Sequence, residues 1–401
     1  MKEMNGKQKC LAVLLAAGFL AVQCAAPLPA GSPLAPVSAS AFTAWSIQEI
    51  SSVELAPGLT QRQFSYTING NTTQCFEYSL DPKDDRVSLR VTMPGDGADY
   101  GLDTVRDMAN SAIVNGKDVV AAVNGDMYNM STGEPWGVVY QDGKLVHNYN
   151  AAGRNWLFVG FTKDGELVYG DQSVYEQTWP QLDQALGLHS VLAEGGRNVC
   201  TDTSSTRAPR TAVGLRADGT VFFLVADGRQ SSSGGLSLSE LADLMIKEGA
   251  QWAGNLDGGG GSTAVSRLPG ETKLTVRNSP SDGSERNVAN SIVFLTSGSP
   301  SSQVVQAAKE SLYGTVKSDT TLPVTIRQGE SYQFRMTLVE GSNPPVCYTD
   351  NTSAFTVTYT GNQGRDYFYK VTATGAPGAS GEIYTKVPNM EGVRQCTVVV
   401  G

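Results

Sequence analysis

Residues Val221 to Val265, VFFLVADGRQSSSGGLSLSELADLMIKEGAQWAGNLDGGGGSTAV, decide the fold expected for this chain. The apolar run 221–226 predicts a buried strand. A helix is expected to begin at Ser237, because Ser237 and Glu240 form a capping box that satisfies N–H groups of the first turn. Gly249 stands where a left-handed cap ends such a helix. The order is therefore strand, helix and second strand.

Chemistry-bearing residues follow both predicted strands. Asp227 and Arg229 come directly after the first strand, and Asp257 with four consecutive glycines, 258–261, follows the second. In a strand–helix–strand unit the residues just past the strand ends share one sheet edge, so these side chains are expected to converge. A glycine run is typical of backbone that approaches a ligand such as phosphate. A flexible turn and a hairpin turn are the alternatives that the residues leave open.

The N-terminus has the layout of a secretory signal. Three lysines within the first nine residues precede an apolar run from 11 to 22. We expect a secreted or cell-surface protein of a bacterial envelope, with 1–41 as signal peptide or N-terminal anchor and leader. Contact with a membrane is expected only through an uncleaved N-terminal segment, since the apolar run is short for a span of about 20 residues.

Composition and cysteine usage limit the function classes. The 401 residues are 40% hydrophobic and 17% charged, which is enough for more than one domain. The net charge of −9 argues against nucleic acid as a partner. The cysteine spacing matches no zinc pattern. We predict a disulfide between Cys347 and Cys396, whereas Cys75 and Cys200 are left either paired or as buried thiols.

Only two histidines, His147 and His189, are present. A histidine base or a histidine-rich metal site would have to use one of them, so carboxylates and arginines are the better candidates. A short buried strand, 119–123, leads into Asn124, Gly125 and Asp126. This Asn-Gly follows a strand just as the two Asp-Gly pairs do.

Several ordered motifs together resemble the phosphodiester glycosidase family. They are AVNGDMYN, GVVYQDGKL, RAPRTAVGL, VADGRQSSSGGLSLSELADLM and NLDGGGGSTAV, followed by Arg286 and Ala-Asn-Ser before a strand. The match covers roughly residues 95 to 297. Gly261 stands where the family usually has a serine, and Ser262 and Thr263 follow.

The resemblance implies an α+β, mixed-sheet catalytic domain that hydrolyses a sugar, such as N-acetylglucosamine, from a sugar-1-phosphodiester. Cleavage at the sugar needs a carboxylate near an oxocarbenium-like centre. Asp257 is the first candidate, and Asp227 or Glu134 the second. Arginine's planar fork suits a phosphodiester, and the amides after Asp257 are expected to add donors as a nest. The candidate substrate-binding residues are Asn124, Gly125, Asp126, Arg210, Arg229, Gly258, Gly259, Gly260, Ser262 and Asn290.

No required cofactor is predicted. Asp126, Asp227 and Asp257 offer oxygen ligands suited to calcium, which stays an alternative, but no recognisable calcium loop is present. No metal-ligating residue is therefore assigned.

After Thr296 the composition changes. The phosphodiester glycosidase-like domain is expected over 42–298, a linker over 299–320, and a small all-β sandwich resembling immunoglobulin-like modules over 321–401. The expected partners are a glycan or sugar-phosphodiester substrate and an envelope polymer such as a cell-wall glycan or exopolysaccharide. The alternative function is a protein that binds a phosphosugar or cell-wall glycan without cleaving it.

Overall fold

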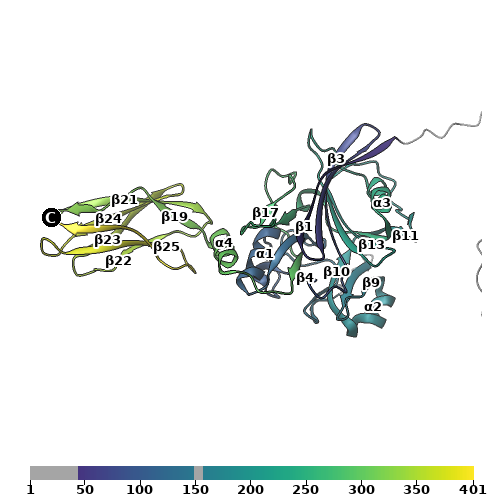
Figure 1. Ribbon diagram of the computed structural model, residues 1–401, viewed down its shortest axis with the longest axis horizontal. Helices are drawn as coiled ribbons and strands as arrows, with labels where there is room; N and C mark the ends of the chain where they lie inside the picture. Colours follow the sequence, from purple (N-terminus) through teal and green to yellow (C-terminus); the bar gives the residue numbers. More distant parts are fainter. Residues whose placement is uncertain (1–43, 149–156) are drawn as a thin grey trace, which may run out of the picture. The chain divides into compact units, whose positions relative to one another are not determined.

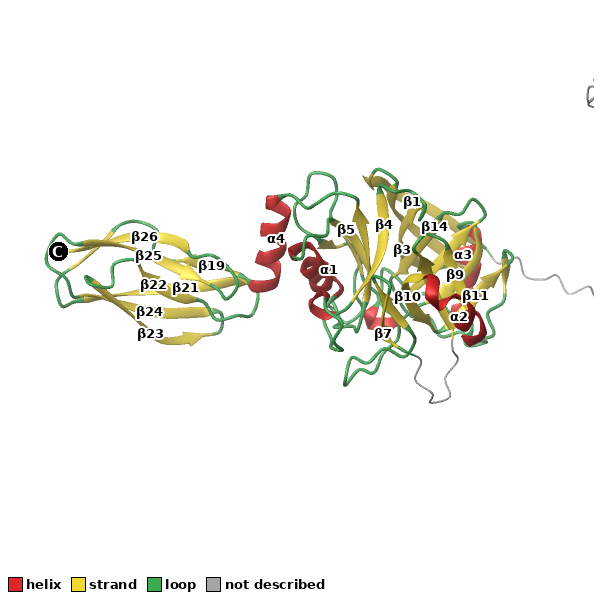
Figure 2. Cartoon of the chain, turned by 90° about the horizontal axis from the view of Figure 1, so that it is seen from below, coloured by secondary structure: helices red, strands yellow, loops and turns green. Residues whose placement is uncertain are grey.

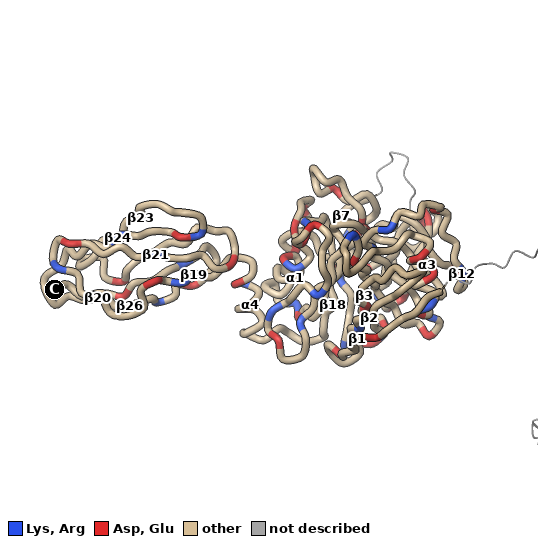
Figure 3. The backbone as a smooth tube through the Cα atoms, turned by 90° about the horizontal axis from the view of Figure 1, so that it is seen from above, with Lys and Arg blue, Asp and Glu red and all other residues tan. Residues whose placement is uncertain are grey.

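The computed structural model describes residues 44–148 and 157–401 (Figure 1). The predicted signal segment, 1–41, lies outside the described residues. Within the described part no helix is both long enough and apolar enough to cross a membrane. Figure 3 shows acidic and basic residues interspersed along the backbone.

The largest sheet carries the stretch quoted first. Its described strands lie in the order β1-β2-β3-β14-β13-β15-β11-β12, and every pairing is antiparallel. The strands are β1 (Trp45–Ala56), β2 (Leu59–Ile68), β3 (Asn71–Leu80), β11 (Ser190–Glu194), β12 (Arg197–Asn198), β13 (Arg210–Arg216), β14 (Val221–Ala226) and β15 (Ala250–Asn255).

Two five-stranded sheets complete this part of the described chain, in the orders β7-β6-β10-β8-β9 and β17-β16-β5-β18-β4. The strands of the first are β6 (Val139–Gln141), β7 (Lys144–His147), β8 (Leu157–Thr162), β9 (Leu167–Gly170) and β10 (Leu182–Leu188). Those of the second are β4 (Val87–Thr92), β5 (Val119–Asn124), β16 (Ala264–Ser266), β17 (Thr275–Val276) and β18 (Ser291–Thr296). All their pairings are antiparallel. Phe223, Leu186 and Phe294, one from each sheet, are buried in one shared core.

The predicted α+β, mixed-sheet class is wrong for this chain, which is mostly β, with antiparallel pairing throughout its described sheets apart from one parallel pair in the C-terminal part. β14, α3 (Leu238–Lys247) and β15 follow one another in the predicted strand–helix–strand order, but the two strands are not neighbours in the sheet. Instead β13 lies between β14 and β15 and pairs antiparallel with both. The helical crossover therefore spans an intervening strand, and no parallel pair forms in this sheet.

The helix α3 forms as predicted. Ser237 is its N-cap, and Ser237 and Glu240 make both hydrogen bonds of the capping box. Leu241, Leu244 and Met245 pack against the largest sheet in a second core. Gly249, with φ of 96°, follows the helix and permits the left-handed turn.

The remaining helices cover the other sheets (Figure 2). Met108 of α1 (Val105–Val114) and Val304 of α4 (Ser302–Tyr313) pack with Val293 of β18 in a third core. Tyr175 of α2 (Gln172–Thr178) packs with Phe158 of β8. Short 3-10 turns within the described residues are η1 (Pro94–Asp96), η2 (Trp179–Gln181) and η3 (Gly259–Gly261).

The C-terminal part contains two four-stranded sheets, ordered β19-β21-β24-β23 and β20-β26-β25-β22. Phe334, Val371 and Ile383 are buried in its own core. The segment predicted as a linker, 299–320, holds α4 and β19, and the immunoglobulin-like likeness stays a prediction. The strands are β19 (Thr315–Ser318), β20 (Val324–Ile326), β21 (Ser331–Glu340), β22 (Val346–Thr349), β23 (Phe355–Gln363), β24 (Asp366–Ala373), β25 (Ser380–Lys386) and β26 (Val393–Val400).

The predicted disulfide between Cys347 and Cys396 is wrong in this structure, where both thiols are free and buried. Strand β25 lies between β22, which carries Cys347, and β26, which carries Cys396. Two strand spacings of about 4.8 Å separate their backbones by about 9.6 Å, beyond the reach of a disulfide. Cys75 is a buried free thiol, and Cys200 is a partly exposed one.

Candidate active site

Three strand termini lie at the same end of the largest sheet. Strands β14 and β15 both run antiparallel to β13, so their C-terminal ends lie beside its N-terminal end. Arg210, the first residue of β13, pairs with Ala226, and Asp227 follows directly. Asp257 comes two residues after the end of β15. The sheet therefore gathers an arginine and two aspartates from distant parts of the chain.

Asn124, at the end of β5, ties the third sheet to this edge. Its side chain is fully buried. The Oδ1 atom accepts hydrogen bonds from Thr211 Oγ1 at 2.7 Å and from the Thr263 amide at 3.1 Å. Its Nδ2 atom donates to the Asp257 carbonyl at 2.8 Å. These bonds give Asn124 a positioning role, whereas its role in binding substrate stays a prediction.

Asp126 is a buried carboxyl held by backbone amides. Its carboxylate accepts hydrogen bonds from the amides of Met127 at 2.6 Å and Gly137 at 2.8 Å. The Asp126 amide donates to Asn290 Oδ1 at 2.7 Å. Burial raises the pKa of Asp126 to about 7, the amide bonds oppose this rise, and the charge of Asp257 adds to it. The sequence did not single out Asp126 as a catalytic candidate.

Asp257 lies next to Asp126 in this arrangement. Its amide donates to the Gly125 carbonyl at 3.0 Å. Burial raises the pKa of Asp257 to about 6, and the Gly258 amide and the charge of Arg286 limit the rise. Two neighbouring carboxyls with raised pKa values are typical of an acid–base site.

The other two predicted carboxylates have protein partners of their own. Asp227 is buried and accepts hydrogen bonds from Asn278 Nδ2 at 2.9 Å and the Ser279 amide at 3.0 Å. Glu134 lies 3.6 Å from His147 Nε2, and His147 Nδ1 donates to the Gly137 carbonyl at 2.7 Å. The geometry thus favours Asp126 over both as the partner of Asp257, and their catalytic roles stay predictions.

Arg210 and Arg229 form no ion pair with a carboxylate in the described part of the chain, unlike most arginines near them. Arg210 Nε donates to the Leu236 carbonyl at 2.9 Å, so the backbone orients its guanidinium. Burial lowers the pKa of Arg210, Asp202 partly offsets this, and the charge of Arg229 adds to the lowering. Two arginines close enough to repel each other, without an acidic partner, suit a bound anion.

The glycine loop lets Asp257 and Arg229 lie close to the backbone, whereas three of its amides are not available for the predicted anion-binding nest. The amides of Gly259, Gly261 and Ser262 donate to the carbonyls of Pro209, Gly258 and Gly259, so these three N–H groups are not free for an anion. A Cβ on Gly259, whose φ is 63°, would lie 3.4 Å from Arg229 Nη1. At Gly261 a Cβ would lie 2.7 Å from Asp257 Oδ2. Glycine at that position therefore leaves space for the carboxylate.

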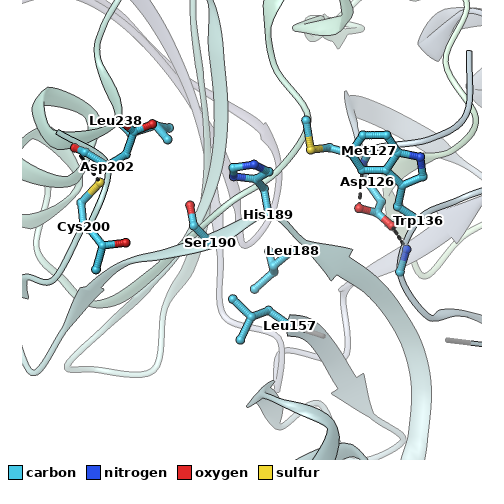
Figure 4. Close-up of a pocket in the computed structure, with 12 residues that line it drawn as sticks. Asp126, Met127, Trp136, Leu157, Leu188, His189, Ser190, Cys200, Asp202 and Leu238 are labelled. Atoms are coloured by element: carbon cyan, nitrogen blue, oxygen red, sulfur yellow. Dashed lines mark hydrogen bonds between the residues drawn. The ribbon is translucent and has the colours of Figure 1, made fainter. Parts of the chain in front are cut away.

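A pocket of about 490 Å³ opens beside Asp126 (Figure 4). Its lining is mostly apolar with a few polar groups, a combination common in ligand sites. The lining residues are Asp126, Met127, Trp136, Gly137, Leu157, Leu188, His189, Ser190, Cys200, Thr201, Asp202 and Leu238. Among the functional candidates, the sequence missed Ser190 and Asp202, because only strand register and loop packing bring them into the pocket that Asp126 also lines.

Several buried polar atoms in the described residues have no hydrogen-bond partner. They include Ser262 Oγ and Asn290 Nδ2 near the glycine loop, and Ser190 Oγ and Asn255 Oδ1 near the pocket. Nowhere in residues 44–148 and 157–401 are three His, Cys, Asp or Glu side chains grouped so that they could hold a metal ion.

Comparison with known proteins adds the following likenesses. Residues 117–295 match the family model described as phosphodiester glycosidase. An uncharacterized protein derived from the SPbeta prophage of Bacillus subtilis is 30% identical over 251 residues, which cover 60% of this chain and 34% of that protein. The N-acetylglucosamine-1-phosphodiester alpha-N-acetylglucosaminidase of Mus musculus is 31% identical over 186 residues, which cover 42% of this chain and 34% of the mouse enzyme.

Among solved structures, the zebrafish N-acetylglucosamine-1-phosphodiester alpha-N-acetylglucosaminidase catalytic domain, auto-inhibited by its pro-peptide, is 22% identical. The alignment covers 62% of this chain and 87% of that one, with a TM-score of 0.48. The chain spans about a third of the length of the two curated relatives.

Proposed function

We propose, from the match of residues 117–295 to the phosphodiester glycosidase family model, that the chain hydrolyses a sugar-1-phosphodiester to free sugar and a phosphomonoester. The observation that carries the proposal is the pair of carboxyls with raised pKa values, Asp126 and Asp257, beside two arginines without acidic partners. Such a site combines acid–base groups with an anchor for a phosphodiester anion.

The arginines bind the phosphate in this proposal. Arg210 is oriented by the Leu236 carbonyl, and Arg229 extends over Gly259. Each guanidinium can donate two hydrogen bonds to phosphate oxygens. The negative charge of the diester relieves the repulsion between the two cations, which is a reason for the protein to leave them unpaired.

The carboxyl pair acts on the anomeric carbon. Between pH about 6 and about 7 the pair holds one proton, because two neighbouring partly desolvated carboxyls do not both ionise readily. The ionised member stabilises the oxocarbenium-like carbon. The C1–O bond breaks and its electron pair leaves with the phosphate oxygen, which receives a proton from the other member. A water oxygen then bonds to C1, and its proton returns to the pair.

The natural substrate belongs, in our proposal, to a bacterial envelope. The lysine-flanked apolar run 11–22 supports export of the chain. N-acetylglucosamine is the sugar named for the mouse relative, and we propose it here with an envelope glycan or teichoic-type polymer as the source of the diester. The protein is then a secreted or cell-surface hydrolase.

The test is hydrolysis of an alkyl N-acetylglucosamine-1-phosphate diester and of UDP-N-acetylglucosamine in water enriched in ¹⁸O, followed by phosphorus NMR and mass spectrometry. We expect ¹⁸O in the released sugar and none in the phosphomonoester, since the bond breaks on the sugar side. Incorporation of ¹⁸O into phosphate would show a phosphodiesterase and refute the proposal. Tight binding without turnover would indicate the alternative, a phosphosugar-binding protein.

Asp257→Asn should abolish this turnover. The matched control is Asp218→Asn. Asp218 is an exposed aspartate that accepts a hydrogen bond in the turn between β13 and β14, at the end of these strands opposite the site. A control with full activity and a folded, inactive Asp257→Asn variant would assign the loss to the site.

A further inference from the structure

Two unpartnered polar groups lie together beside the pocket. Ser190, in β11, and Asn255, in β15, are directly opposite each other in the antiparallel ladder, so their side chains are on the same face of the sheet. The Ser190 Oγ and Asn255 Oδ1 atoms are both buried without a hydrogen-bond partner. Asn255 is 4% exposed, and Ser190 lines the pocket.

This arrangement is costly unless a ligand completes it. Buried polar groups in folded proteins nearly always have a partner, and one that lacks a partner destabilises the fold. An apolar residue of similar shape at position 255 would avoid the cost. Retaining an amide and a hydroxyl side by side at a pocket therefore points to hydrogen bonds with a bound molecule.

The rest of the pocket indicates what kind of molecule fits. Leu157, Leu188 and Leu238 supply apolar surface, and the Trp136 ring lines the side near Asp126. In Figure 4 His189 is drawn between Ser190 and the group formed by Asp126 and Trp136. A sugar ring has apolar C–H faces and a polar rim of hydroxyls, so this mixture suits it. The volume of about 490 Å³ is within the range of small-ligand sites.

We propose that Ser190 and Asn255 bind two adjacent hydroxyl groups of the sugar whose anomeric carbon lies at Asp126. The inference rests on the proposed function and names the part of the substrate that the pocket recognises. Adjacent ring hydroxyls are separated by about the length of one hydrogen bond. Each hydroxyl donates and accepts, as a serine hydroxyl does, and an asparagine amide offers one oxygen acceptor and one nitrogen donor.

The direction of the pocket selects the hydroxyls. The reacting carbon, C1, is placed at the Asp126 end, so the groups that reach Ser190 are those most distant from C1 around the ring. These are the hydroxyls on C3 and C4. Ser190 and Asn255 are thereby specificity-determining residues, and the enzyme distinguishes sugars at these two positions.

The experiment compares alkyl diesters of N-acetylglucosamine 1-phosphate with their 3-deoxy and 4-deoxy analogues on the full chain. Wild-type protein should lose at least about 10-fold in kcat/KM and in affinity on one or both deoxy analogues, since a buried group is then left without its partner. In the Ser190→Ala and Asn255→Leu variants, kcat/KM and affinity for the N-acetylglucosamine diester should fall by about the same factor. Removing the matching hydroxyl from the sugar should lower neither value further.

Asn110→Leu is the matched control. Asn110 is a buried asparagine of α1 whose Nδ2 atom also lacks a partner, but it does not line this pocket. Both leucine variants should keep or raise the melting temperature, because each removes a buried amide atom that has no hydrogen-bond partner. Only Asn255→Leu should change the response to the deoxy sugars.

The outcomes separate this inference from the proposed function. Hydrolysis with an undiminished deoxy penalty in both pocket variants would overturn the inference and leave the function intact. A deoxy penalty that disappears in the variants, measured by calorimetric binding without any turnover, would support the inference and refute the hydrolase. Failure of wild-type protein to bind any of these sugars would overturn the inference.

Discussion

Replacing Asp257 by asparagine should remove activity and stabilise the fold, and the gain should depend on pH. The folded-state pKa of Asp257 is about 6, above its ordinary value of 3.8. A carboxyl whose pKa is raised by folding costs nothing below the unfolded pKa. Its cost grows as pH rises from 3.8 to about 6 and is complete above that value. Wild-type protein therefore carries the cost at pH 8 and is largely free of it at pH 4.

The size of the effect follows from the same two pKa values. At about 1.36 kcal/mol per pH unit, the interval from 3.8 to about 6 corresponds to about 3 kcal/mol at pH 8 and about 0.5 kcal/mol at pH 4. Because Asp257 is partly exposed, about 3 kcal/mol is an upper figure. For a domain of this size that gain raises the melting temperature by roughly 6–12 °C at pH 8.

The assay is thermal and denaturant unfolding of wild-type and Asp257→Asn protein at pH 4 and pH 8, alongside hydrolysis. The difference between the stability changes at pH 4 and pH 8 reports the titration of Asp257, because a change in packing would alter the free energy of unfolding equally at both pH values. Asp218→Asn is the control: the hydrogen bond from the Thr220 amide outweighs burial and lowers the pKa of Asp218. An equal stability change at pH 4 and pH 8, or an Asp257→Asn enzyme that still turns over, would refute the reasoning.

Four further outcomes are expected. The profile of kcat/KM against pH should be bell-shaped with its maximum between about 6 and about 7, because Asp126 and Asp257 must share one proton; a flat profile over pH 5–8 would contradict this. Arg229→Ala should raise KM on the order of 10-fold or more and weaken inhibition by inorganic phosphate, measured by steady-state kinetics. Arg216→Met should lower the free energy of unfolding by about 3 kcal/mol in denaturant titration without changing KM, because it removes a hydrogen-bonded partner of the buried Glu77 carboxylate, whose pKa burial already raises. Deleting 316–401 should leave hydrolysis of the small diester unchanged, since the candidate site lies within the preceding part of the chain.

Local signals in the sequence were reliable where neighbouring residues decide the structure. The helix α3 begins at Ser237 because its cap and its Glu240 partner are three residues apart. The apolar runs before Asp227 and Asp257 form strands of one sheet, as predicted. Helix caps and strand ends depend on the spacing of residues that are close in the sequence, and this spacing can be seen in the sequence alone.

The errors arose where distant segments decide the structure. The mixed-sheet prediction was wrong because β13 lies between β14 and β15 and pairs antiparallel with both. The residues of β14 and β15 do not indicate which strand lies between them. The disulfide failed for the same reason, since β25 lies between the strands of Cys347 and Cys396. Strand order is a property of the whole sheet.

The sequence by itself gives the ordered motifs, the glycine loop and the positions of Arg210 and Arg229, and with them the resemblance to the phosphodiester glycosidase family and the expectation of an anion-binding site. Only the tertiary structure decided that Asp126, rather than Asp227 or Glu134, adjoins Asp257, and that Ser190 faces Asn255 beside a pocket. The physical reason is that the pKa of a carboxyl and the satisfaction of a polar group depend on burial and on partners more than 60 residues away, as for Asn255 and Ser190.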